Sequence, residues 1–369
     1  MKAAASILLA GLAISASPLF SGCGSGSSDH PRSQPGEVVV YSSVDDEYVR
    51  PIAELFAKHA GIRVKLVLDT EETKSTSILN RLIAEAERPR ADVFWSGDPV
   101  RAAVLKTHDL SAPYLPKQKA GLATKYSDPD NHYVSFSARI RVIIYNTNLL
   151  AGRALPASIH DLTDVRFRSR ACIANPLYGT TSMHAAALFQ VLGDRGGRAW
   201  FEKLNANGVK MLSSNGEVRR RVAAGDFDIG LTDSDDVNVA LRDGKPINFV
   251  IPDQDSLGTL LIPNAAALVR GAPNAQNGKA FIDFLISQEV EQLLARSEAV
   301  QIPLREGLAT PPLFGRDWRQ LRLMAVDYAK LAAGFEELNK RFLEDWVRQQ
   351  SGSSAGPVEA NPHTEASRT

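Results

Sequence analysis

EVVVYSSVDDEYVRPIAELFAKHAGIRVKLVL, residues 37–68, contains the pattern that decides the fold. Residues 38–41 are a short β-branched and aromatic run of the kind found in a buried strand. Apolar residues then recur at helical spacing up to Gly61, a residue that commonly ends a helix. Residues 62–68 predict a second strand. The stretch therefore predicts a strand, a helix and a strand in succession.

The same alternation continues along the chain. Residues 77–87 predict a helix and residues 91–95 a third strand. Further strands are predicted at 170–174, 209–212 and 227–231. Strands separated by helices of this length are typical of a mostly parallel sheet with helices on both faces. The fold class predicted is therefore α/β.

Length and charge narrow the class of protein. A chain of 369 residues can form two domain-sized units, each with its own core. The 42 basic and 42 acidic residues balance, whereas nucleic-acid-binding proteins normally carry a basic surplus. We therefore expect no nucleic-acid partner.

The N-terminus has the composition of a secretory signal. Lys2 precedes an apolar run over residues 3–19 that is short for a membrane span. Ser21-Gly22-Cys23 resembles a bacterial lipobox, which implies cleavage after residue 22 and a lipid on Cys23. The alternative is an ordinary secretory signal with an incidental cysteine.

Three further expectations follow for the ends of the chain and its thiols. Residues 23–36 are rich in Gly, Ser and Pro and predict a flexible tether. Residues 350–369 are polar and predict a disordered tail. Cys172 lies in an apolar stretch and is expected to be a buried, inert thiol without a disulfide partner.

Three strand-to-helix junctions are rich in hydroxyl and carboxylate side chains. They lie at residues 41–46, 178–181 and 232–236. Ligands of open parallel sheets bind beyond the carboxyl ends of the strands. Helix N-termini there favour anions. The alternative for each junction is simple N-capping by Ser, Thr or Asp.

Taken together in their order and spacing, several segments resemble the ferric-iron/phosphonate group of periplasmic solute-binding proteins. These segments are residues 38–43, 91–98, 173–176, 178–181 and 280–290. The resemblance implies a type II periplasmic-binding-protein fold with two lobes that close around a ligand, each lobe a mostly parallel sheet flanked by helices. By that resemblance, lobe 1 is 37–137 plus 266–349 and lobe 2 is 138–265.

The resemblance also implies a set of site residues. Ferric-binding members use adjacent tyrosines where this chain has Asp235 and Asp236, and a histidine where it has Asp45. The three aspartates are therefore candidate metal ligands. The anion-binding positions of the group are better matched. The candidate ligand-binding residues are Ser42, Ser43, Ser96, Tyr178, Gly179, Thr180, Thr181, Asn215 and Asp233.

Arg139 and Arg141 alternate in a predicted crossover strand, so both lie on one face. A guanidinium in the cleft suits a phosphonate or carboxylate. Alternatively, one of the two arginines pairs with a structural acid.

Two ligands suit these residues. One is a hard cation such as Fe(III), carried as cargo together with a synergistic anion, because hard cations prefer oxygen ligands. The other is a zwitterion such as an aminophosphonate, or another phosphorylated small molecule. A third interpretation gives Asp235 and Asp236 only a role in stabilising the start of their helix.

No nucleophile elbow, zinc-binding helix or phosphate loop is present in the sequence. We expect no enzyme and no cofactor. The resemblance implies instead a monomeric binding protein of an ABC importer with permease and ATPase partners, periplasmic or at the cell surface, held to the membrane only by its lipid. A ligand-sensing receptor lobe of the same fold is the alternative.

Overall fold

Strand β1 (Glu37–Ser42) lies between two parallel neighbours, β2 (Arg63–Leu68) and β3 (Val93–Ser96). All three strands form close to the positions predicted from the sequence. The structure is a computed structural model that describes residues 36–69 and 76–352. These described residues belong to one compact unit. The predicted signal peptide, Cys23 and nearly all of the tether lie outside them.

A second group of three parallel strands follows the same logic. Strand β6 (Ala171–Ala174) pairs on one side with β7 (Lys210–Leu212) and on the other with β8 (Ile229–Asp233). These strands also confirm the predicted positions. Cys172 in β6 is fully buried with a free thiol, as expected.

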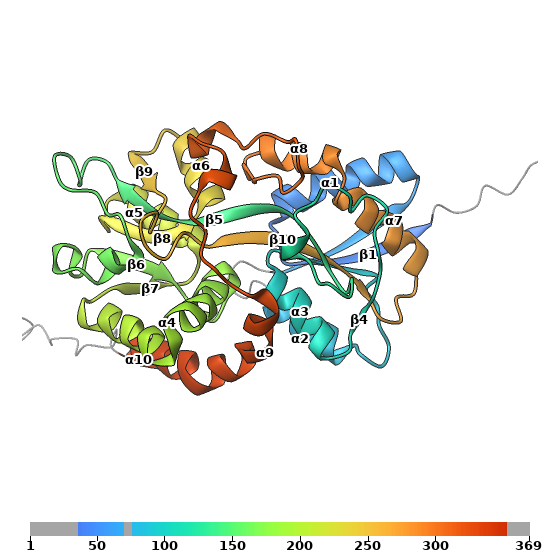
Figure 1. Cartoon of the computed structure of the whole chain (residues 1–369), viewed down its shortest axis with the longest axis horizontal. Helices are drawn as coiled ribbons and strands as arrows, with labels where there is room; N and C mark the ends of the chain where they lie inside the picture. The colour runs from blue at the N-terminus through green and yellow to red at the C-terminus, as the bar shows by residue number, and fades with distance from the viewer. Residues whose placement is uncertain (1–35, 70–75, 353–369) are drawn as a thin grey trace, which may run out of the picture. The chain divides into compact units, whose positions relative to one another are not determined.

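Two long antiparallel strands join the groups. All 13 residues of β5 (Val134–Asn146) are buried. Its first half pairs with β10 (Leu261–Val269), and its second half pairs with β8 and the short β9 (Ile247–Val250). The strand order is β2-β1-β3-β10-β5-β8-β6-β7, and β4 (Ser111–Ala112) pairs with β10. Figure 1 shows β5 and β10 running between the two groups.

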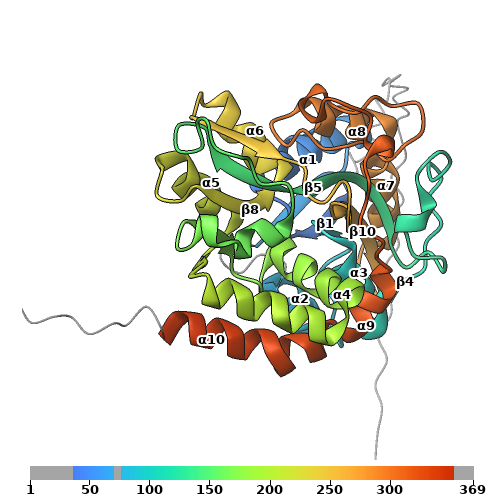
Figure 2. The ribbon, with the colours of Figure 1, turned by 60° about the vertical axis from the view of Figure 1, so that its left-hand side comes forward.

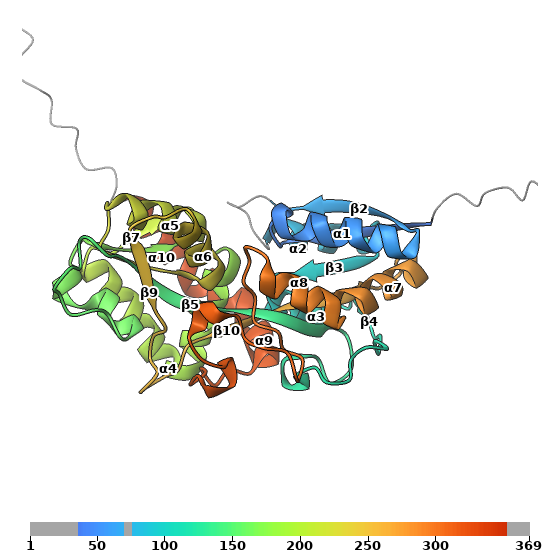
Figure 3. The same cartoon turned by 90° about the horizontal axis from the view of Figure 1, so that it is seen from above.

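Helices flank both groups of strands (Figure 3). Around the first group lie α1 (Asp46–Ala60), α2 (Thr76–Ala84), α3 (Pro99–Thr107), α7 (Ala275–Leu285) and α8 (Gln288–Arg296). Around the second lie α4 (Gly179–Ala206), α5 (Asn215–Ala224) and α6 (Ser234–Arg242). Short 3₁₀ turns occur at Thr124–Tyr126, Ile159–Thr163, Val165–Phe167, Pro312–Phe314 and Trp318–Gln320. This arrangement confirms the predicted α/β class. Both groups are parallel inside, and the antiparallel pairs come from the two joining strands.

The C-terminal segment is an integral part of the fold. It runs through α9 (Tyr328–Leu338), a π-helical turn (Asn339–Leu343) and α10 (Glu344–Gly352). Helix α9 contacts both α3 and α4, and the three helices lie together in Figure 2. In α10, the Trp346 indole Nε1 donates to the Phe201 carbonyl of α4 at 3.1 Å. The helix thus extends slightly into the tail predicted at 350–369.

The hydrophobic core has two parts. The smaller packs α1 and α7 against β1, with Phe56 and Phe281 in edge contact at 5.0 Å between ring centroids. The larger runs from the first group of strands through β5 into α4 and α9. Because the larger part is continuous, the division into lobes 37–137 plus 266–349 and 138–265 stays a prediction. Among the described residues, no helix is both long and apolar enough to traverse a bilayer.

The segment after α8 is held against the start of β10. The amide of Thr259 donates to the Arg322 carbonyl, and the amide of Met324 donates to the Thr259 carbonyl, both at 2.9 Å. Gly258, which precedes them, has a φ of +80°, and an added Cβ would meet the Leu323 carbonyl carbon at 2.5 Å. A side chain therefore cannot be accommodated at position 258 without moving the backbone.

We predict that Gly258→Ala lowers the free energy of unfolding by about 2–4 kcal/mol, because left-handed strain and a backbone clash add together. For a chain of this size the melting temperature should fall by roughly 3–6 °C in a thermal unfolding experiment. Gly307→Ala is the matched control, since its φ is +78° and its added Cβ meets nothing within 4 Å. Equal losses in the two variants would contradict the clash.

Candidate functional site

The carboxyl ends of β1, β6, β7 and β8 lead into helices whose N-termini converge on one pocket of about 490 Å³. These helices are α1, α4, α5 and α6. The loop after β3 contributes Gly97. Parallel strands place their following helices at one edge of the sheet, so the predicted convergence of the junctions has a direct structural cause.

Most of the residues predicted for the site line this pocket. They are Ser43, Asp45, Arg139, Tyr178, Gly179, Thr180, Thr181, Asn215, Asp233, Asp235 and Asp236. The structure thus brings Asp45 of the first junction into the same pocket as the aspartates of the third.

Three predicted residues are not among those that line the pocket. Ser42 is fully buried and accepts a hydrogen bond from the Val44 amide at 3.1 Å. Ser96 likewise accepts from the Asp98 amide at 3.3 Å. Each hydroxyl thus stabilises the turn of its own loop by accepting from an amide two residues further along the chain. Arg141 lies beneath the pocket floor with no exposed surface.

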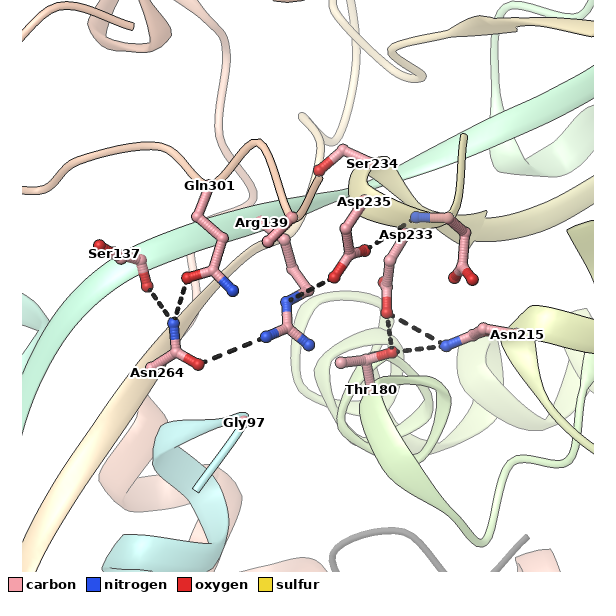
Figure 4. A network of polar contacts seen from close by, with 12 residues as sticks. Gly97, Ser137, Arg139, Thr180, Asn215, Asp233, Ser234, Asp235, Asn264 and Gln301 are labelled. Atoms are coloured by element: carbon pink, nitrogen blue, oxygen red, sulfur yellow. Dashed lines mark hydrogen bonds and ion pairs between the residues drawn. The ribbon is translucent and has the colours of Figure 1, made fainter. Parts of the chain in front are cut away.

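Arg141 organises the floor through Asp233, its strand partner across β5 and β8. The two side chains form an ion pair at 2.8 Å between Nη1 and Oδ1. The Thr180 hydroxyl donates to the other Asp233 oxygen at 2.5 Å, and the Asn215 amide nitrogen donates to the same oxygen at 3.1 Å. Figure 4 shows Thr180 and Asn215 gathered at Asp233. The carboxylate of Asp233 is therefore saturated by the protein.

The hydroxyls of Thr180 and Thr181 consequently donate to side chains of the protein itself. Thr180 gives its proton to Asp233, and Thr181 donates to the Asn215 side-chain oxygen at 3.1 Å. The groups at this wall that remain for an anion are the first-turn amides of α4, because such amides have no acceptor within the helix. Tyr178, the N-cap residue, makes no side-chain cap. Of the hydroxyls and helix N-termini predicted to receive an anion, the hydroxyls of Thr180 and Thr181 donate within the protein.

Arg139 is one of the guanidiniums that line the pocket. Its Nε lies 3.5 Å from an oxygen of Asp235, and its Nη2 donates to the Asn264 side chain at 3.3 Å. Asn264 in turn donates to Gln301 at 2.6 Å and to the Ser137 carbonyl at 2.8 Å (Figure 4). Burial opposes the charge of Arg139, but the nearby aspartates outweigh it and hold the pKa of Arg139 above its ordinary value.

The third junction supplies a carboxylate cluster. Asp233, Asp235 and Asp236 each place an oxygen within 4.8 Å of the others. Asp236 accepts from the Thr232 hydroxyl at 2.8 Å, and Arg219 lies 3.9 Å away. Burial and the charges of Asp235 and Asp233 raise the pKa of Asp236 well above its ordinary value. This cluster is therefore short of positive charge.

Sequence reasoning missed several lining residues, among them Asp46, Glu47, Tyr48 and Arg219. Burial and the negative charge of Asp235 hold the pKa of Tyr48 far above its ordinary value, so the phenol is protonated in the ligand-free protein. The helical spacing of Tyr48 predicts a core residue, and Tyr48 both belongs to the smaller part of the core and lines the pocket. Arg219 belongs to a run of three arginines that a sequence alone assigns to a solvated face.

The charge of the lining is uneven. Its carboxylates are those of Asp45, Asp46, Glu47, Asp233, Asp235 and Asp236, and its guanidiniums are those of Arg139 and Arg219. Helix N-termini add positive potential where their amides point into the pocket. The pocket therefore combines an amide-lined side suited to an anion with a carboxylate side suited to a cation.

We predict that the ligand-free protein becomes less stable as pH rises through the raised pKa of Asp236. The folded state binds this proton more tightly than the unfolded state, so the free energy of unfolding falls between the ordinary and the raised pKa. Each unit of difference corresponds to about 1.4 kcal/mol. Asp236→Asn should raise the melting temperature at pH 8 and leave it little changed at pH 4.

Asp194→Asn provides a control of opposite sign. Hydrogen bonds from Arg198 and Arg341 lower the pKa of Asp194, so its ionised form favours the folded state and the variant should lose stability at pH 8. Melting curves of both variants from pH 4 to pH 8 measure the difference. A loss of stability in Asp236→Asn at pH 8 would contradict the crowded carboxylate cluster.

The chain matches the family of bacterial extracellular solute-binding proteins over residues 38–297. A putative 2-aminoethylphosphonate-binding periplasmic protein of Salmonella typhimurium is 29% identical over 256 residues, covering 67% of this chain and 71% of that one. The major ferric iron-binding protein of Neisseria meningitidis serogroup A is 25% identical over 272 residues, covering 71% and 80%. These relatives are binding proteins, which confirms the prediction that the chain is not an enzyme.

The fold has a close counterpart among solved structures. The periplasmic binding protein AfuA from Actinobacillus pleuropneumoniae, with fructose-6-phosphate bound, superposes with a TM-score of 0.75 at 23% identity. The match covers 86% of this chain and 99% of that one. It confirms the predicted periplasmic-binding-protein fold. Together, the site at the strand ends and these matches show that the chain belongs to the bacterial extracellular solute-binding protein family.

Proposed function

We propose that this chain captures a small zwitterion bearing a phosphonate or phosphate group and an ammonium group. The observation that carries the proposal is the lining of the pocket, which combines four helix N-termini with a carboxylate cluster. A simple anion would meet the carboxylate cluster, and a simple cation would leave the first-turn helix amides without an anionic partner. A molecule with one charge at each end satisfies both sides.

The anionic group is expected at the start of α4 and α5. Gly179 has a φ of 53° and no side chain, so a ligand can approach its backbone closely. Asn215 and Gly216 begin α5 on the same pocket wall. Three oxygens of a phosphonate can accept from amides of both helices, and the positive ends of the helix dipoles add to the attraction.

The ammonium group is expected at Asp235 and Asp236. Asp235 lies in the carboxylate cluster and forms an ion pair with Arg139 at 3.5 Å. Burial and the charges of Asp235 and Asp233 oppose the ionisation of Asp236 in the ligand-free pocket and raise its pKa. A monovalent ammonium group beside these two carboxylates would reduce the electrostatic repulsion between them.

Fe(III) with a synergistic anion, the ligand first expected from the resemblance, is the second candidate. The spacing of the three carboxylates within 4.8 Å favours it, as do the ferric-binding relatives. Two contacts favour the zwitterion instead. Asp233 is saturated by Arg141, Thr180 and Asn215, and the Arg139 guanidinium beside Asp235 would repel a trivalent ion more strongly than a monovalent ammonium.

The wider role follows from the relatives. Periplasmic relatives and the signal-like N-terminus support a binding protein anchored outside the cytoplasm through Cys23, which delivers its ligand to an importer with permease and ATPase subunits. Closure of two lobes about β5 and β10 is the motion expected for such a protein. Uptake of the ligand by cells, lost on deletion of the gene, separates this role from that of a ligand-sensing receptor lobe.

The ligand class can be tested by calorimetry with compounds that each lack one group. 2-Aminoethylphosphonate carries both charges, ethylphosphonate lacks the ammonium and ethanolamine lacks the phosphonate. We predict that only the first binds tightly and that either truncation weakens binding at least about tenfold. At a hundredfold its dissociation constant the ligand should stabilise the fold by about 2.7 kcal/mol. Ferric citrate and fructose-6-phosphate complete the panel.

Each outcome has a distinct meaning. Equal binding of ethylphosphonate and 2-aminoethylphosphonate would remove the ammonium from the proposal. A response to ferric citrate alone would establish the metal site instead. A response to fructose-6-phosphate alone would be consistent with an anion at the starts of α4 and α5 and would contradict the proposal of a zwitterion.

We predict that Asp235→Asn weakens the binding of 2-aminoethylphosphonate by about 10- to 100-fold, because it removes a charge-assisted partner of the ammonium. The same change should leave the weaker binding of ethylphosphonate unchanged or improve it. Asp345→Asn is the control, since it alters an exposed ion pair with Arg348 on α10. Isothermal titration of both variants with both compounds measures the effect, and a parallel loss for the two compounds would contradict the assignment of Asp235 to the ammonium.

A further inference from the structure

Arg101 in α3 is almost fully buried, with 1% of its surface exposed, although it carries a charge. Its own helix N-cap, Asp98, accepts from its backbone amide at 3.0 Å and from Nη1 at 3.2 Å. Its other contacts reach further. Nη1 also donates to the Gly179 carbonyl at 3.3 Å, and Nη2 donates to the Ser182 hydroxyl at 2.5 Å.

These contacts join the two groups of strands. Helix α3 follows β3 of the first group, and helix α4 follows β6 of the second. Arg101 therefore connects segments that are far apart in the sequence and that belong to different parts of the sheet. The Phe335 ring of α9 stacks on the guanidinium at 4.5 Å from the ring centroid, which closes off a third side.

The same segments form opposite walls of the candidate pocket. Gly97, next to Asp98, lines one side, and Gly179, whose carbonyl accepts from Arg101, begins the amide wall on the other. Arg101 itself is not among the lining residues. It therefore lies behind the pocket and fixes the distance between its walls.

We propose that Arg101 is a positioning residue, a latch that holds the start of α4 against the start of α3 and so favours the ligand-ready pocket. If the starts of α3 and α4 move apart, Nη1 and Nη2 of Arg101 lose the Gly179 carbonyl and the Ser182 hydroxyl as acceptors. Asp98 cannot replace both of these acceptors. The proposal rests on the proposed function in one respect, namely that a solute binds between these walls. Because Arg101 does not line the pocket, its effect should not depend on which solute binds there.

The test uses Ser182→Ala, which removes the hydroxyl acceptor on α4 and keeps the Arg101–Asp98 pair intact. Ser135→Ala is a matched control, because Ser135 of β5 is also fully buried and donates to the Tyr126 carbonyl at 2.6 Å, in the 3₁₀ turn that precedes β5. Arg101→Lys serves as a second variant that keeps the charge but cannot reach both acceptors. All three variants have the same pocket lining as the wild type.

We expect Ser182→Ala to raise the dissociation constant of 2-aminoethylphosphonate about 5- to 20-fold, because the binding-competent arrangement becomes less populated. Small-angle X-ray scattering of the ligand-free variant should give a larger radius of gyration than that of the wild type. Arg101→Lys should change both quantities in the same direction. Ser135→Ala should lower the melting temperature by a similar amount and change neither.

An unchanged radius and dissociation constant in both Ser182→Ala and Arg101→Lys would overturn the latch. So would an equal rise of the dissociation constant in Ser135→Ala, since that would indicate a general loss of stability. The scattering measurement needs no ligand. If the wild type binds nothing in the panel, the proposed function fails, and the ligand-free radii still decide whether Arg101 holds the walls together.

Discussion

The buried pair of Arg141 and Asp233 is the interaction on which the arrangement of the site depends. A guanidinium with no exposed surface is stable inside a protein only when an anion and further acceptors surround it. Asp233 meets this need from the end of β8, directly opposite Arg141 in the strand register. The remaining oxygen of Asp233 then accepts from Thr180 of α4 and Asn215 of α5. One charge pair thus fixes the starts of three helices.

This arrangement determines which groups are left for a ligand. Asp233, Thr180 and Thr181 are occupied by bonds within the protein, so they shape the pocket more than they bind in it. The starts of α4 and α5, together with Asp235 and Asp236, also line the pocket. Breaking the pair by removing either partner would leave an uncompensated buried charge, and it would release α4 and α5 together.

The strands and the location of the site could be predicted from sequence, because both follow from local patterns. Alternation of β-branched runs with helical periodicity predicts the parallel strands, and parallel strands bring their junctions to one edge. Ser43, Asp45 and Gly179 were found for this reason. Their convergence in one pocket needs no knowledge of side-chain contacts.

The depth and pairing of side chains could not be predicted in the same way. Alternation along β5 places Arg139 and Arg141 on one face, yet one lines the pocket and the other lies beneath it. The difference arises because Arg139 pairs with β10 and Arg141 with β8. Asn264 and Gln301, which orient Arg139, come from distant segments and carry no local signal. Ser42 and Ser96 instead accept hydrogen bonds from amides two residues further along their own loops.

Within a family whose members bind ferric iron and phosphonates, the acids of α6 are the part of this pocket most able to discriminate. Backbone amides at a helix start accept any tetrahedral oxyanion of suitable size, so the α4 wall separates phosphate from phosphonate poorly. The acidic side chains of α6 would contact the part of the ligand to which the phosphonate or phosphate is attached. Where the resemblance leads one to expect adjacent tyrosines, this chain has Asp235 and Asp236, which are smaller, more strongly charged and already near Arg139. A ligand that supplies positive charge there gains twice, once from the attraction and once from relieving the crowding around Asp236. Selectivity then follows from the electrostatic state of the ligand-free pocket.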